Sequence, residues 1–247
     1  MKGESMEGVT FPGIPTPFHW LAGPAVAFAV GVGELTLEAG PGTDWFVDPS
    51  GESDATVNSP ALVGSIDGDL MLRAFVRPEF VETYDAGVLV LWGDERTWAK
   101  LCFEYSPQGV PTVVSVVTRG VSDDCNSISV DGEGIWLRIS RLGEAFAFHA
   151  SIDGSTWQLI RYFALPSTQP LAVGFQAQSP LGAGCRSDSR GSNSCRNGFR
   201  TCGAACSSSA SSDALGVRAV EGIRHRRGRA AGTPSGPRAQ RRLRARA

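Results

Sequence analysis

Charged and polar side chains alternate with apolar ones along two neighbouring segments, TWAKLCFEYS and PTVVSVVTRG. In the first segment, Lys100 and Glu104 share one face of an extended chain, and in the second segment Ser115 and Arg119 share a face. Adjacent strands bring side chains on a common face together. We therefore expect these four side chains to meet on the concave face of a sheet, where they offer a ligand both charges and a hydroxyl group.

Aromatic and amide side chains from other segments extend this candidate site. A sugar stacks its C–H face on an aromatic ring and pairs its hydroxyls with charged or amide groups, so the mixture predicts carbohydrate binding. The alternative is that Lys100 and Glu104 form a surface ion pair worth under about 1 kcal/mol and that the tryptophans belong to the core. The predicted ligand-binding residues are Trp45, Asp48, Trp92, Lys100, Glu104, Ser115, Arg119 and Gln178.

Other reactive residue types lack the companions that catalysis or metal binding needs. Glycosidases place two carboxylates across one bond, but Asp94–Glu95 and Asp123–Asp124 are sequence neighbours in loop-like segments and would point apart on an extended chain. The second pair also lacks a full calcium ligand loop. His149 has no His or Cys companion and is interpreted as a hydrogen-bonded sheet residue. We predict no catalytic residue, no metal site and no cofactor.

The elements that position these residues are predicted to be β-strands. Period-two alternation dominates from Asp69 onward, in DLMLRAFVRP, YDAGVLVLWG, TWAKLCFEYS, PTVVSVVTRG, GIWLRISRLG, EAFAFHASID, STWQLIRYF and PLAVGFQAQS. Asp153-Gly154 is a hairpin signal because glycine adopts the positive φ of tight turns. GVGELTLEAG and TDWFVDP suggest further short strands. Many short strands with turns every 8 to 12 residues or so predict an antiparallel all-β sandwich.

Composition divides the chain near Cys185. Residues 1–185 carry 22 acidic and 9 basic side chains, a net charge of −13, whereas residues 186–247 carry 3 acidic and 14 basic ones, a net charge of +11. All six tryptophans and all three tyrosines lie before Cys185, so the material for a hydrophobic core is confined there. One folded domain followed by a tail is the expected organisation.

Several blocks resemble the DUF1349 family in order along the chain: FHWLAGPA, AGPGTDWFVDP, DAGVLVLWGDERTWAKLCFEYSPQG, SVVTRGVSDDCNS, WLRISRLGEAFAFHASIDGSTWQLIRYF and GFQAQSPLGAGC. The resemblance covers about residues 17–185. It implies a jelly-roll β-sandwich similar to concanavalin A-like lectins and glucanases. It implies little about activity, because jelly rolls host many functions and the family is largely uncharacterised. The glucanase motif Glu-x-Asp-x-x-Glu does not occur in this sequence.

The segment after Cys185 differs from the corresponding segment of the family. Family members continue there into a last strand, whereas this chain has RSDSRGSNSC and then a Ser/Ala/Arg/Gly-rich run with fourteen arginines and no lysine. If its serines use TCN codons, the offset frame is compatible with Val-Arg-Leu-Glu-Gly-Ile-Glu-Phe, a strand-like alternation. We hypothesise that a frameshift falls near Cys185. The predicted parts are a lead-in (1–16), the β-sandwich (17–185) and a disordered tail (186–247) that is out-of-frame translation.

Two functional alternatives for the tail remain. Cys185, Cys195, Cys202 and Cys206 offer four thiolates to zinc, but their spacing lacks the paired CxxC geometry. The arginines offer phosphate contacts to a nucleic acid, but no aromatic residues are interleaved with them. We predict neither zinc nor nucleic-acid binding.

The sequence favours a non-enzymatic binding protein for a sugar or sugar-derived metabolite. A regulatory protein that binds a metabolic enzyme is the alternative, because the resembling family includes a yeast protein named for regulation of enolase. A carbohydrate-active hydrolase is the second alternative. The N-terminus shows no signal peptide, no segment reaches the ~18 apolar residues of a membrane helix, and the cysteines before residue 186 show no paired spacing. We expect a cytoplasmic protein without a membrane partner.

Overall fold

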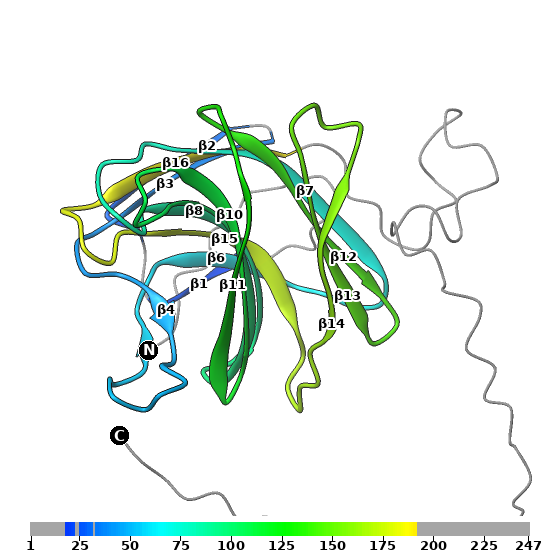
Figure 1. The fold of residues 1–247 in the computed structure, drawn as a ribbon. Coiled ribbons are helices and arrows are strands. Elements are labelled where there is room, and N and C mark those ends of the chain that lie inside the picture. The colour runs from blue at the N-terminus through cyan, green and yellow to red at the C-terminus, as the bar shows by residue number, and fades with distance from the viewer. Residues whose placement is uncertain (1–17, 23–24, 32, 192–247) are drawn as a thin grey trace, which may run out of the picture. The chain divides into compact units, whose positions relative to one another are not determined.

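The computed structural model describes residues 18–22, 25–31 and 33–191, and its regular elements there are all strands. Two seven-stranded antiparallel sheets pack face to face, with a two-stranded ribbon beside them (Figure 1). The all-β sandwich expected from the period-two pattern is confirmed. Within these described residues, no helix is long and apolar enough to cross a membrane.

Sheet 1 carries most of the predicted site residues. Its strands, in order across the sheet, are β1 (Phe18–Leu21), β6 (Ala61–Ser65), β15 (Ala172–Gln178), β8 (Ala86–Asp94), β9 (Thr97–Tyr105), β10 (Pro111–Arg119) and β11 (Val121–Ser129).

Sheet 2 forms the other layer and brings distant parts of the chain together. Its strands, in order, are β14 (Gln158–Ala164), β13 (Ala145–Ser151), β12 (Ile135–Leu142), β7 (Leu70–Pro78), β16 (Cys185–Gly191), β3 (Glu34–Ala39) and β2 (Ala27–Gly31). The small ribbon pairs β4 (Trp45–Phe46) with β5 (Thr56–Val57).

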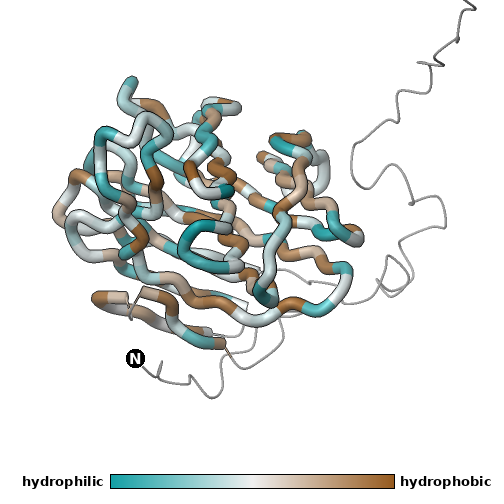
Figure 2. The backbone as a smooth tube through the Cα atoms, turned by 90° about the horizontal axis from the view of Figure 1, so that it is seen from below, coloured by the Kyte–Doolittle hydropathy of each residue, from teal (hydrophilic) through white to brown (hydrophobic). Residues whose placement is uncertain are grey.

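The main core lies between the two sheets. Alternate residues of each strand point into it, and its largest members include Phe103 and Phe175 from sheet 1 and Phe148 from sheet 2, all 0% exposed. Figure 2 shows the resulting alternation of hydrophobic and hydrophilic residues along the chain. The predicted Asp153-Gly154 hairpin joins β13 to β14, and Gly154 has a φ of 70°, which glycine adopts without strain.

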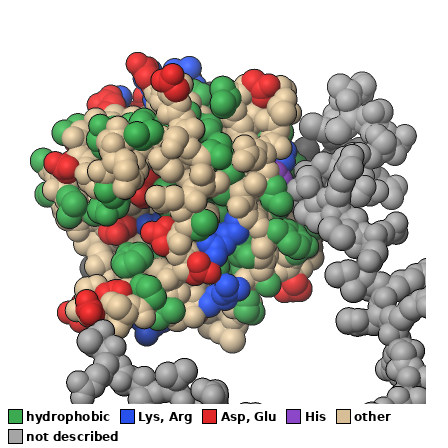
Figure 3. Space-filling view, in the orientation of Figure 1, with side chains coloured by type: hydrophobic (Ala, Val, Ile, Leu, Met, Phe, Trp, Pro, Cys, Tyr) green, Lys and Arg blue, Asp and Glu red, His purple; other side chains and the backbone are tan. Residues whose placement is uncertain are grey.

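Arginine side chains bridge the two sheets at the edge formed by β11 and β14. Arg161 of β14 forms an ion pair with Asp123 at 2.6 Å and donates a hydrogen bond to the Asp123 carbonyl at 3.1 Å. Arg119 at the end of β10 donates to the Ala164 carbonyl at 3.2 Å. In Figure 3, basic and acidic side chains accordingly lie next to one another on this face of the molecule, without a large patch of one sign.

Two expectations from the sequence are wrong. Asp123 and Asp124 do not lie in a loop; they belong to β11, an edge strand whose polar sequence masks its extended backbone. The strand pattern also does not end at Cys185, because residues 186–191 form most of β16.

Strand β16 is internal to sheet 2, where it pairs with β3 on one side and β7 on the other. The sheet therefore does not lose the strand that follows Cys185. The serines at 187 and 189 point into the core and are 3% and 5% exposed, although serine is a poor core residue. The predicted tail from residue 192 onward, with three of the four candidate zinc cysteines, and the lead-in 1–16 lie outside the described residues.

Candidate functional site

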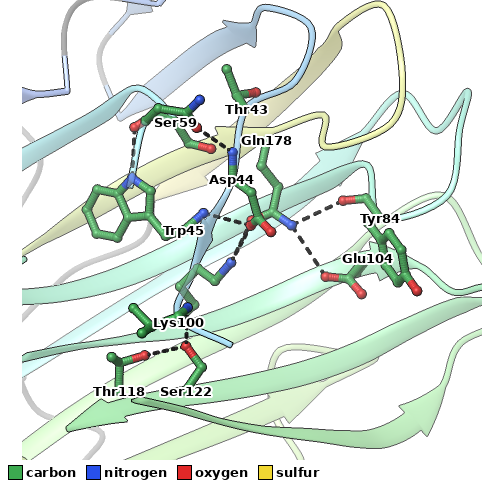
Figure 4. A network of polar contacts seen from close by, with 12 residues as sticks. Thr43, Asp44, Trp45, Ser59, Tyr84, Lys100, Glu104, Thr118, Ser122 and Gln178 are labelled. Atoms are coloured by element: carbon green, nitrogen blue, oxygen red, sulfur yellow. Dashed lines mark hydrogen bonds and ion pairs between the residues drawn. The ribbon is translucent and has the colours of Figure 1, made fainter. Parts of the chain in front are cut away.

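The candidate site lies on the outer face of sheet 1, the face that points away from the main core. Lys100 and Glu104 of β9 lie on this face, and Gln178 of β15 joins them across the intervening strand β8. The Lys100 ammonium donates hydrogen bonds to Asp44 Oδ1 at 2.9 Å and to Gln178 Oε1 at 2.8 Å (Figure 4). Lys100 is only 2% exposed, so its charge is neutralised internally.

The polar chain continues from Gln178 to Glu104. The Gln178 Nε2 group donates to the Tyr84 carbonyl at 3.1 Å and makes a longer contact of 3.5 Å with Glu104 Oε2. The Asp44–Lys100–Gln178–Glu104 chain therefore runs from a partly buried ion pair to a partly exposed carboxyl group. We call these four residues the polar chain.

Burial dominates the protonation of the carboxyl at the end of the polar chain. Burial raises the pKa of Glu104 to about 8, and Asp124 and Asp44 add to this effect while the Lys100 charge opposes it. Glu104 therefore holds its proton at neutral pH and offers one O–H donor together with acceptor oxygens. Burial is the largest influence on Lys100 and lowers its pKa, but Asp44, Cys102 and Glu104 together outweigh burial, and the net pKa of Lys100 is raised.

A segment of chain crosses this outer face and covers part of it. Trp45 is 0% exposed, packs against Trp92 with 4.8 Å between ring centroids, and donates from Nε1 to the Ser59 carbonyl at 3.0 Å. Val47 exchanges hydrogen bonds at 2.9 Å with Ser122 of β11. A second apolar cluster forms underneath this segment. The crossing segment therefore covers part of the outer face, while Glu104 remains partly exposed.

The structure brings together three of the predicted binding residues and separates others from them. Lys100, Glu104 and Gln178 form one connected group, as the strand faces predicted. Trp45 and Trp92 do contact each other, but the buried Trp45 ring offers no face to a ligand. The packing of these two tryptophans therefore fits a role in the core better than a role in ligand binding.

Ser115 and Arg119 lie on the opposite face of sheet 1 from Lys100, so their assignment to the site is wrong. In the β9–β10 pairing Ser115 is directly opposite Leu101, a core residue, and residues that face each other across a ladder share a side. A pairing offset by one residue reverses the face of every side chain, and the sequence does not specify that offset.

Asp48 also lies outside the group, in the loop between β4 and β5. Its carboxylate accepts hydrogen bonds from the backbone and side chains of Ser50 and Ser53 at 2.7–3.1 Å. These hydrogen bonds lower the pKa of Asp48. Asp48 thus stabilises its own turn, and these side-chain hydrogen bonds stay within the loop.

Sequence reasoning missed Asp44, Asp124 and Tyr84. Asp44 pairs with Lys100 from 56 positions away, and no local pattern marks it. Asp124 lies opposite Val116, in the same row of side chains as Lys100, and burial raises its pKa. Tyr84 carries a φ of 69°, which is unusual for a bulky residue, and its carbonyl holds Gln178.

One further polar side chain on this face is without a hydrogen-bond partner in the described part of the chain. Gln176, two residues before Gln178, is 1% exposed, and neither atom of its amide has a hydrogen-bond partner within the described chain. A buried amide left unpaired costs about 1–3 kcal/mol per group. Among the described residues, no group of three or more His, Cys, Asp or Glu side chains has the arrangement of a metal site.

Comparison with known proteins places the chain in a family. Residues 20–191 match the family model described as "Protein of unknown function (DUF1349)". This chain belongs to the DUF1349 family. The Saccharomyces cerevisiae protein named "Regulation of enolase protein 1" is 26% identical to this DUF1349 protein over 169 residues, which make up 68% of the chain and 83% of the relative.

Solved structures establish the fold class of this DUF1349 protein. A functionally unknown protein from Saccharomyces cerevisiae superposes with a TM-score of 0.66 at 23% identity, over 72% of this chain and 95% of that one. The GH43 BlXynB protein from Bacillus licheniformis superposes with a TM-score of 0.57 at 12% identity, over 72% of this chain but only 36% of that longer one. The expected jelly-roll β-sandwich is confirmed as the fold.

Proposed function

We propose that this DUF1349 protein is a non-enzymatic binding protein for an uncharged sugar or sugar-derived metabolite. The observation that carries the proposal is the polar chain, which ends at the partly exposed Glu104 carboxyl. With a pKa of about 8, this carboxyl is mostly protonated at neutral pH, and it presents a donor and an acceptor of the kind that a sugar hydroxyl needs. Gln178, the next member of the polar chain, is itself held in place by its hydrogen bond to the Tyr84 carbonyl.

The placement of the cations favours an uncharged ligand over a phosphorylated one. Lys100 is buried and already paired with Asp44, and Arg119 lies on the opposite face of the sheet. Arg161 is engaged by Asp123 at the sheet edge. No described Lys or Arg therefore remains on the outer face of sheet 1 near Glu104 to bind a phosphate or carboxylate group.

Tyr84 supplies the aromatic surface in this proposal. Tyr84 is 38% exposed, and its backbone is joined to Tyr105, next to Glu104, by a hydrogen bond of 2.8 Å. An exposed ring beside a donor–acceptor pair suits the C–H face of a pyranose. In this proposal, Tyr84 takes the role that the sequence assigned to the tryptophans.

The test is a binding titration followed by NMR amide shifts and tryptophan fluorescence, with a panel of neutral mono- and oligosaccharides and their phosphates. We expect a neutral sugar to shift resonances around Glu104, and Glu104→Ala to weaken binding about tenfold or more, as loss of a good polar contact of about 1.4 kcal/mol does. Glu104→Gln, which keeps a neutral donor and acceptor, is expected to retain most of the affinity. Glu144→Gln, an exposed change elsewhere, is the matched control. A preference for sugar phosphates, or no response to the whole panel, would exclude the proposed ligand class.

A second candidate function is regulation of a metabolic enzyme by direct binding. The observation that favours it is the name of the yeast relative, "Regulation of enolase protein 1". Co-purification with enolase at a fixed stoichiometry, abolished by high salt or by surface substitutions, is the expected result. If enolase and this protein elute separately at micromolar concentrations, this candidate fails while the sugar proposal stands.

A hydrolase is less well supported. In the strand register, Glu104 and Asp124 lie two strands apart and four residues apart along the strands, about 16 Å between Cα atoms on ideal spacing. Retaining glycosidases hold their carboxyl groups about 5–5.5 Å apart.

We further propose a cytoplasmic location, which is supported by the three described cysteines, Cys102, Cys125 and Cys185, being free thiols.

A further inference from the structure

Four segments that are distant in sequence meet at one end of the sandwich: residues 40–44, 79–85, 105–110 and 179–184. Thr43 and Ser179 exchange backbone hydrogen bonds of 3.1 and 3.2 Å. The Ser179 hydroxyl donates to Asp85 at 2.7 Å, and the Tyr84 amide donates to the Tyr105 carbonyl at 2.8 Å. We call this connected surface the loop end.

The loop end exposes several large apolar side chains. Val81 is 77% exposed, Leu181 66%, and Tyr84 and Val110 38% each. The segments of Val81 and Leu181 are in contact, because a Cβ built at Gly182 would lie 3.1 Å from Glu82 Cβ. Single exposed apolar residues need no explanation, but a group of them on adjoining loops marks an interaction surface.

The charge of the loop end has one sign. Its four segments contain four acidic residues and no Lys, Arg or His. Three of the four have partners: Asp44 pairs with Lys100, Glu79 pairs with Arg186 at 3.7 Å, and Asp85 accepts hydrogen bonds from the Val81 and Glu82 amides and from Ser179. Glu82 is exposed beside Val81, so an acidic group is adjacent to the apolar ones.

The backbone of the loop end is held in an unfavourable conformation. Tyr84 has a φ of 69°, in the left-handed region that costs a bulky residue about 1–3 kcal/mol. Its amide and carbonyl are both engaged, by Tyr105 and Gln178, and the 0%-exposed Asp85 fixes the preceding turn. Such strain persists where the surrounding structure imposes it, which is common at binding surfaces. The loop end is therefore pre-shaped.

We propose that the loop end is a docking surface for a protein partner that presents a segment of basic residues flanked by aliphatic ones. Aliphatic side chains of the partner pack on Val81, Leu181 and Val110, and a Lys or Arg pairs with Glu82 and stacks on the Tyr84 ring. A second copy of this chain fits less well, because two loop ends would juxtapose like charges. The proposal shares with enzyme regulation the need for a protein partner, and it shares the Tyr84 ring with the proposed sugar site.

The probe is a pair of synthetic peptides with equal apolar content, one with the repeat Lys-Leu-Gly-Ser and one with the repeat Glu-Leu-Gly-Ser. Each is titrated into the isotopically labelled full chain. We expect the lysine peptide to shift the amide resonances of Val81, Tyr84, Val110 and Leu181. The double substitution Val81→Ser and Leu181→Ser is expected to weaken binding about tenfold.

Matched controls separate this site from general attraction between a cationic peptide and an acidic protein. Glu82→Lys is expected to weaken binding strongly, whereas Glu144→Lys, the same charge change at an exposed turn, is expected to leave it nearly unchanged. Ile152→Ser, at a 79% exposed site on another loop, controls for the apolar substitutions.

Several results would overturn the inference. These are equal binding of the glutamate peptide, equal weakening by the Glu144 and Glu82 substitutions, or resonance shifts confined to other loops. Self-association through the loop end, detected by sedimentation and removed by the Val81/Leu181 pair of substitutions, would assign the surface to a second copy instead. Because none of these variants alters Glu104 or Gln178, loss of peptide binding leaves sugar binding to be judged separately.

Discussion

Removing the hydroxyl group of Ser187 is expected to stabilise the protein. Ser187 lies on the core side of β16, is 3% exposed, and its Oγ has no hydrogen-bond partner within the described chain. It faces Gly87 of the opposite sheet, where a Cβ built on the glycine would collide with Ser187 Oγ. A buried hydroxyl without a partner costs about 1–3 kcal/mol, so a central strand carries a polar group that nothing in the described core satisfies.

The substitutions Ser187→Ala and Ser187→Val divide this effect into two parts. The alanine variant removes the unpaired hydroxyl at little change in volume, and we expect the free energy of unfolding to rise by about 1 kcal/mol. Relative to alanine, the valine variant buries two further methyl groups, worth about 1.6 kcal/mol, so its expected gain over the parent is about 2–3 kcal/mol if no overpacking strain intervenes. For a domain of this size, each kcal/mol raises the melting temperature by about 2–4 °C.

Urea unfolding monitored by tryptophan fluorescence measures the change. Ser127→Val, on the exposed edge strand β11, is the control and is expected to stay within about 0.5 kcal/mol of the parent. If both substitutions at Ser187 lower the urea midpoint while the control does not, the hydroxyl contributes to the fold and the reasoning is wrong.

The same positions bear on the reading frame of the gene. The frameshift hypothesis gives Val and Leu where the present chain has Ser187 and Ser189, and both serines occupy buried positions of an internal strand. We therefore propose that the strand was selected in the offset frame. Resequencing the coding DNA from the Gly174 codon onward tests this proposal. An offset frame that soon stops or lacks apolar alternation would refute it.

Two further predictions concern the outer face of sheet 1. The folded chain holds the Glu104 proton up to about pH 8, whereas an unfolded chain releases it near the ordinary pKa of 4.5. Between these two pH values the folded state binds more protons than the unfolded state. Stability is therefore expected to fall as pH rises from about 4.5 to about 8. Glu104→Gln should reduce that slope in urea midpoints measured across the range; an unchanged slope would contradict the raised pKa. Trp45→Ala is expected to lower the free energy of unfolding by about 3–5 kcal/mol, since Trp45 is fully buried and hydrogen-bonded to Ser59. Phe46→Ala, at the partly exposed neighbouring position, is the control and is expected to lower it far less. Equal losses would mean that the crossing segment does not pack as described.

The sequence predicted which residues lie on a common strand face but not how the faces combine. Lys100 and Glu104 share a face because side chains alternate along any strand, and that expectation needs no tertiary information. Ser115 was assigned to the wrong side because the pairing of β9 with β10 depends on the turn between them. Asp44 could not be found, since its partner Lys100 is brought to it only by the folded sheets.

The local sequence pattern also did not predict the burial of Trp45 or the two polar strands, β11 and β16. In sequence, Trp45 was interpreted as an aromatic ring that a loop supplies to the ligand, yet the crossing segment packs this ring against Trp92 and Trp98. β11 and the polar part of β16 were not recognised as strands, because their hydrogen-bonding partners, and not their own side chains, define them. Residue type predicts a strand well only where the strand is also apolar.

The position of β16 has a consequence for the order of events in folding. β3 pairs only with β2 and β16 within the described sheets, so β16 is the element that joins the β2–β3 hairpin to the rest of sheet 2. The hairpin is synthesised first, but its place in the sheet is completed only when residues 185–191 have left the ribosome. Contacts of such long sequence separation slow folding. Any nascent chain that ends before residue 185 would expose two unpaired strand edges, at β3 and β7, to its neighbours.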